Sequence, residues 1–74
     1  MIISIELFGQ LSPQSPRCQT LELASQAKVQ EVVCLLGLNP DEIGLITING
    51  VQSELENTLL PDCRLCFFPY ITGG

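Results

Sequence analysis

Only one stretch of the sequence repeats its apolar residues with the period of an α-helix. The residues of this stripe are spaced three and four apart: Val29, Val32, Val33 and Leu36. We predict a helix over this stretch, ended by Gly37, because a glycine readily takes the positive φ of a helix C-terminus. Ser25 is the candidate N-cap, although no acidic residue three positions later completes a capping box. A single helix can bury its apolar stripe only against a sheet, and it can cover only one face of that sheet.

The other regular segments have the patterns of strands. Residues 2–8 alternate, with Ile3, Ile5 and Leu7 on one face, as is typical of a half-buried strand. Alternation and turn signals predict four more strands, at 18–23, 44–49, 51–52 and 64–68. Two strands, a helix and three further strands predict an α+β fold of the β-grasp type. Such a fold has a mixed sheet of four to five strands with one main helix on one face.

Length and charge limit the functions open to this chain. Seventy-four residues make one domain with a marginal core, too little chain for a deep substrate pocket and its scaffold. The formal net charge of −5 argues against nucleic acid, whose phosphates need clustered lysine and arginine. No apolar run approaches the roughly 18 residues of a membrane span, and the N-terminus lacks the features of a signal peptide. We therefore expect no membrane contact and a cytoplasmic location.

The four cysteines are expected to be reduced thiols there: Cys18, Cys34, Cys63 and Cys66. Cys63 and Cys66 form a CxxC sequence, but residues three apart on a strand point to opposite faces, so these thiols should not converge. The chain has no histidine and no second CxxC, and we expect no metal site. No motif for nucleophilic catalysis occurs either.

The last five residues are predicted to be an extended, flexible tail, 70–74, on a domain formed by residues 1–69. Pro69 ends the last strand because proline cannot donate to a sheet, and the tail could reach about 17 Å beyond it. Gly73 and Gly74 have no side chains, so a narrow channel in another protein can close around them. The Gly74 carboxylate, ionised at neutral pH, can attack the α-phosphate of ATP held by a partner. A sulfur nucleophile can then displace AMP from the acyl-adenylate and leave a thiocarboxylate.

The end of the chain resembles a known family. Phe67-Phe68-Pro69-Tyr70-Ile71-Thr72-Gly73-Gly74 is similar to the Phe-Phe-Pro-Pro-Val-Ala/Thr-Gly-Gly ending of molybdopterin synthase small subunits. These subunits belong to the MoaD/ThiS group of ubiquitin-like sulfur carriers. The likeness covers the whole chain in order, including Phe8-Gly9-Gln10 and Asn49-Gly50. Tyr70 departs from it, because the small subunits usually have a second proline there, and Lys28 stands where a threonine N-cap is frequent.

The resemblance implies a carrier with no catalytic side chain and no bound cofactor. A ubiquitin-activating-type adenylating enzyme would activate Gly74 with ATP and Mg, and a persulfide donor would supply sulfur. The thiocarboxylate would then enter the molybdopterin synthase large subunit and donate its sulfur in molybdenum cofactor biosynthesis. The chain would thus be the non-catalytic, sulfur-bearing subunit of a sulfurtransferase.

The same resemblance assigns roles to residues beside Gly74. Ile71, Thr72 and Gly73 would lie in the partner's channel. Apolar residues on the outer face of the sheet meet the partner in this family, and the matching positions are Phe8, Phe68 and Pro69.

Three alternatives remain open. The chain could carry sulfur for thiamine or another sulfur-containing metabolite. It could be a ubiquitin-like protein modifier, with Gly74 joined to lysines of other proteins. It could also be a plain binding module in which the terminal glycines have no role.

Overall fold

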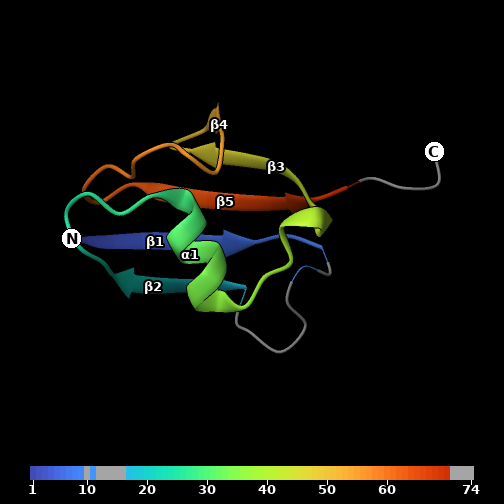
Figure 1. Cartoon of the computed structure of the whole chain (residues 1–74), viewed down its shortest axis with the longest axis horizontal. Helices are drawn as coiled ribbons and strands as arrows, with labels where there is room; N and C mark the ends of the chain where they lie inside the picture. The colour runs from blue at the N-terminus through green and yellow to red at the C-terminus, as the bar shows by residue number, and fades with distance from the viewer. Residues whose placement is uncertain (10, 12–16, 71–74) are drawn as a thin grey trace.

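A five-stranded mixed sheet with one helix across one face forms the body of the molecule (Figure 1). The computed structural model describes residues 1–9, 11 and 17–70. The elements follow in the order β1 (Ile2–Leu7), β2 (Cys18–Glu22), α1 (Val29–Leu36), the short 3-10 helix η1 (Pro40–Glu42), β3 (Ile43–Ile48), β4 (Val51–Ser53) and β5 (Arg64–Pro69). The predicted helix and all five predicted strands are present, each strand end within one residue of its expected position. The predicted α+β fold is confirmed.

The last strand of the chain occupies the centre of the sheet. The strands lie in the order β2-β1-β5-β3-β4. β1 and β5 are parallel, and the other neighbouring pairs are antiparallel. In Figure 1, β5 ends on the side of the molecule opposite to the N-terminus. The chain after Pro69 therefore leaves from the middle of one end of the sheet.

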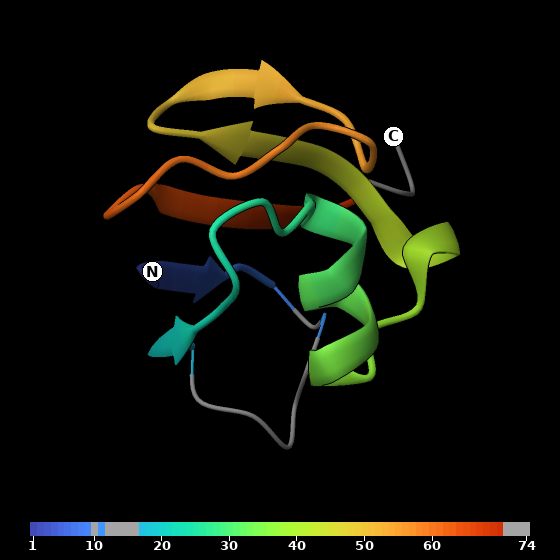
Figure 2. The ribbon, with the colours of Figure 1, turned by 60° about the vertical axis from the view of Figure 1, so that its left-hand side comes forward.

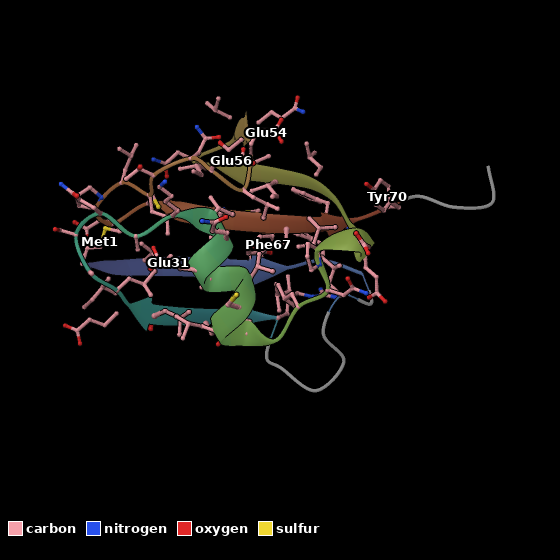
Figure 3. All side chains as sticks on the ribbon, viewed as in Figure 1. Met1, Glu31, Glu54, Glu56, Phe67 and Tyr70 are labelled. Atoms are coloured by element: carbon pink, nitrogen blue, oxygen red, sulfur yellow. The ribbon has the colours of Figure 1, made fainter. Side chains whose placement is uncertain are left out.

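The core lies between the sheet and α1, and no other described helix or strand covers the opposite face of the sheet (Figure 2). Most of its buried side chains come from β1, β3, β5, the helix and the segment before β5: Ile3, Ile5, Leu7, Val29, Val32, Val33, Ile46, Ile48, Leu59, Leu65 and Phe67. Phe67 is fully buried and lies beneath the helix in Figure 3. Burial of one such side chain contributes about 1.5–3 kcal/mol to folding.

The helix begins later than its candidate cap suggests, so the expectation for Ser25 is wrong. Its N-cap is Lys28, whose N–H donates to Glu31 Oε2 at 2.7 Å. The next two N–H groups of the first turn donate to backbone oxygens of the segment 55–57, at 3.1 and 3.0 Å. The backbone of a distant segment therefore accepts the hydrogen bonds that the side chain of a serine N-cap would otherwise accept. Gly37 ends the helix at φ 70°, as predicted.

The helix α1 has eight residues. Within the described ranges, no helix is long and apolar enough to cross a membrane.

Candidate functional site

The tail predicted to carry the chemistry starts where β5 ends. Pro69, the last residue of β5, is half-buried and pairs with Ile43 of β3. Tyr70 follows with 59% of its surface exposed, beyond the end of the strand (Figure 3). We call Pro69 and Tyr70 the tail root. The predicted site residues 71–74 lie outside the described residues, so their roles stay predictions.

A patch of three apolar side chains lies beside the tail root, on the sheet face opposite to α1. The rings of Phe8 and Phe68 stack with their centroids 4.5 Å apart and their planes 9° from parallel. The Phe8 N–H donates to the Phe67 oxygen at 3.0 Å, which continues the pairing of β1 with β5. Leu45 pairs with Phe68 across β3 and β5, and it is 38% exposed. We call Phe8, Leu45 and Phe68 the outer-face patch.

The structure brings together two of the residues that the sequence assigns to a partner interface. Phe8 and Phe68 lie on the outward phase of neighbouring strands, as predicted, and they touch. Their contact with a partner remains a prediction. The sequence reasoning missed Leu45, although it falls on the outward phase of β3, opposite to the buried Ile46 and Ile48.

Polar side chains continue the outer face away from the tail root. The Arg64 guanidinium donates to the carboxylate of Glu6, and 63% of the Arg64 side chain is exposed against 18% for Glu6. This hydrogen bond, helped by the negative charge of Glu6, raises the pKa of the arginine above its usual value. The opposite charges of Arg64 and Glu6 lie side by side in this ion pair.

The two thiols of the CxxC sequence point to different sides of the sheet. Cys63 is buried in the core. Cys66 is also buried, but it sits on the outer phase of β5, in register with Glu6 of β1 and Thr47 of β3. The predicted divergence of Cys63 and Cys66 is therefore confirmed.

In the described part of the chain, no three metal-binding side chains come together. The pocket next to the tail root, lined in part by Gly44, Leu45 and Tyr70, has a volume of ≈ 180 Å³. Small-molecule sites usually measure about 300–1,000 Å³, so this pocket is small for such a site. Three larger hollows, of ≈ 450, 470 and 420 Å³, lie over other parts of the described surface. We take the tail and the outer-face patch as the candidate site because the sequence assigns them a role.

The comparisons with known proteins bear on the fold. No family model and no curated protein matches the sequence. SAMP1 from Haloferax volcanii is 19% identical with a TM-score of 0.79, over 100% of both chains. A second structure, of small archaeal modifier protein 1 from H. volcanii, is 18% identical with a TM-score of 0.76, over 95% of this chain and 98% of that one. The chain has the ubiquitin-like β-grasp fold.

The same fold occurs in a protein of the molybdopterin system. A chain from the complex of subunits 1 and 2 of the molybdopterin-converting factor from Helicobacter pylori 26695 is 18% identical, with a TM-score of 0.65 over 100% of both chains. The structural likeness to MoaD/ThiS-like proteins is thus confirmed at the level of the fold. Because one fold can serve several functions, the function has to be argued from the site.

Proposed function

We propose that the protein is a ubiquitin-like sulfur carrier that works through the carboxylate of Gly74. The observation that carries the proposal is the placement of the tail root at the end of the central strand, beside the outer-face patch with its two half-buried, stacked aromatic rings. A partner that docks on this patch is within the reach of a tail that ends in Gly73-Gly74. The remaining four residues, 71–74, span at most about 14 Å at roughly 3.3–3.6 Å per residue.

The chemistry is one of acyl activation. A ubiquitin-activating-type enzyme supplies Mg-ATP, the Gly74 carboxylate attacks the α-phosphate, and pyrophosphate leaves. A persulfide on a sulfur donor then attacks the acyl carbon and releases AMP. A second thiol cleaves the resulting acyl disulfide, which leaves the thiocarboxylate on Gly74 and a disulfide on the donor. All catalytic groups of these steps belong to the partners.

Molybdopterin synthesis is the pathway that we propose for this sulfur. The Phe67-Phe68-Pro69 run before the tail resembles that of molybdopterin synthase small subunits. The fold likeness to a chain of the two-subunit molybdopterin-converting factor also supports this choice. The outer-face patch and Pro69 would then contact the large subunit, and residues 71–73 would lie in its channel.

A second candidate function is protein modification, because a small archaeal modifier protein has the same fold. Both functions begin with the same acyl-adenylate. They differ in the nucleophile, which is a persulfide for a carrier and a lysine amine for a modifier.

The intact mass of the protein distinguishes these functions. The protein is co-expressed with an adenylating enzyme and a sulfur donor from the same genome. A carrier gains the mass difference between sulfur and oxygen, located on the C-terminal peptide. A modifier instead yields larger species that resist reducing agents. An unchanged mass with every adenylating enzyme of that genome would count against both. The matched control has one residue added after Gly74, which should abolish either product.

A further inference from the structure

Two glycines hold the tail root from the strands on either side of β5. Gly44 belongs to β3, and Gly9 lies two residues after the end of β1. From their contacts we infer that Gly9 and Gly44 are positioning residues for the transfer chemistry. They anchor the tail root so that the Gly74 carboxylate is presented within a limited range of positions relative to the outer-face patch. The inference rests on the proposed function, since it concerns the same carboxylate.

Gly44 is the extra residue of a β-bulge. The pairing of β3 with β5 shifts register between Ile43 and Leu45, so Gly44 has no partner residue on β5. A Cβ atom on Gly44 would lie 2.9 Å from the backbone oxygen of Pro69 and 2.9 Å from the Cα atom of Tyr70. Ordinary contacts between non-bonded heavy atoms are about 3.5–4.0 Å, and backbone atoms cannot rotate away as the end of a side chain can.

The close approach of the tail root is the reason for a glycine at position 44. Gly44 is exposed and does not have the positive φ found at Gly9, Gly37 and Gly50. Backbone conformation therefore does not require glycine there. Any side chain would push the backbone of the tail root away from β3.

Gly9 makes the matching contact from the side of β1. Its φ is 65°, a conformation that favours glycine. A Cβ atom there would lie 2.6 Å from Cγ and 3.3 Å from Cδ of Pro69. The proline ring therefore packs directly on the backbone of Gly9. Both the conformation and the contact require glycine at this position.

The consequence is a tail root that is held on both sides, up to the backbone of Tyr70. Pro69 has a fixed φ, and its ring and backbone are held between Gly9 and Gly44. Because fewer residues can rotate freely, the Gly74 carboxylate samples a smaller volume while the outer-face patch is docked on the partner. A higher effective concentration of the carboxylate at the partner's ATP follows. If the root were released, the domain would still dock, but its carboxylate would reach the nucleotide less often.

The test compares Gly44→Ala with Gly37→Ala. Gly37, at the end of α1, has a positive φ of 70°, unlike Gly44, and a Cβ atom there meets nothing within 4 Å, the tail root included. Gly37→Ala therefore strains the fold without touching the tail. The kcat and KM of adenylation are measured as pyrophosphate release by the ubiquitin-activating-type enzyme with Mg-ATP. The ¹⁵N heteronuclear NOE of the Tyr70 amide is measured in the free protein.

We expect Gly44→Ala to lower kcat about tenfold and to change KM by less than about twofold, because docking by the outer-face patch is kept. The Tyr70 amide should become more mobile in this variant. Gly37→Ala should match the wild type in both measurements. A Gly44→Ala variant with the wild-type kcat would overturn the inference and leave the proposed function standing. Failure to adenylate the wild type would instead overturn the proposed function itself.

A double-mutant cycle keeps the inference testable if Gly44→Ala does not fold. Alanine at position 69 lacks Cγ and Cδ, and the nearest remaining atom, Cβ, lies 3.6 Å from a Cβ on Gly9, an ordinary contact. Gly9→Ala should lower kcat about tenfold when Pro69 is present and by less than about threefold in a Pro69→Ala background. Equal losses in the two backgrounds would show that the contact has no role in presenting the tail.

Discussion

The partner interface can be tested by removing one ring of the aromatic stack. Phe68 is half-buried in the free domain, stacked on Phe8 and paired with Leu45. An aromatic side chain has about 150–250 Å² of surface, and about 50 Å² of the Phe68 surface stays accessible to solvent in the free domain. At about 25 cal/mol per Å², burial of this area on docking is worth about 1.3 kcal/mol. We therefore expect Phe68→Ala to weaken binding to the molybdopterin synthase large subunit about tenfold.

The assay is isothermal titration calorimetry with the large subunit from the same genome. Loss of the ring stack should also cost about 0.5–1.5 kcal/mol of folding stability, so titrations belong well below the melting temperature of the variant. Val51→Ala is the matched control, because Val51 is 67% exposed and apolar but lies on the edge strand β4, away from the patch. The interface assignment is wrong if Phe68→Ala binds as tightly as the wild type. It is also wrong if Val51→Ala loses as much affinity.

Three further predictions concern the core, the helix cap and the end of the chain. Phe67→Ala should lower the free energy of unfolding by about 3–5 kcal/mol in a urea titration, because it leaves a cavity beneath α1; a loss below 1 kcal/mol would contradict that placement. Glu31→Ala should cost about 0.5–2 kcal/mol by the same measurement, since it removes the acceptor of the Lys28 N–H, whereas Glu31→Gln keeps an acceptor and should cost less. Deletion of Gly74 should abolish the sulfur-dependent gain in mass. The affinity for the large subunit should stay within about threefold of the wild type, because the outer-face patch is intact. Sulfur transfer by the shortened chain would refute the role of the Gly74 carboxylate.

Local periodicity explains why much of the fold could be predicted. The period-2 pattern of residues 2–8 assigns Ile3 and Ile5 to the core and Phe8 to the other face, and each lies there. The same rule separates Cys63 from Cys66. Gly37 ends α1 because the conformation of a helix C-terminus depends on the residue itself. These features depend only on the direction in which a side chain leaves its own backbone. That direction is determined by the local secondary structure.

The features that involve distant segments could not be predicted in this way. The N-cap of the helix is Lys28 instead of Ser25, because the N–H groups of Val29 and Gln30 bond to backbone oxygens of the distant segment 55–57. The outward phases of Phe8 and Phe68 are visible in the alternation, but their stacking exists only because β1 and β5 are neighbours. Pattern alone likewise does not reveal which strands pair.

The tail shows the same division. The sequence by itself determined the run Tyr70-Ile71-Thr72-Gly73-Gly74, from whose likeness to a known ending the proposed chemistry was predicted. Only the tertiary structure decided that the tail starts from the central strand and that Gly9 and Gly44 hold its root. The physical reason is that the conformational freedom of a glycine depends on the residue itself. Whether a side chain would clash at that position depends on chain segments that are distant in the sequence and that only folding brings against it.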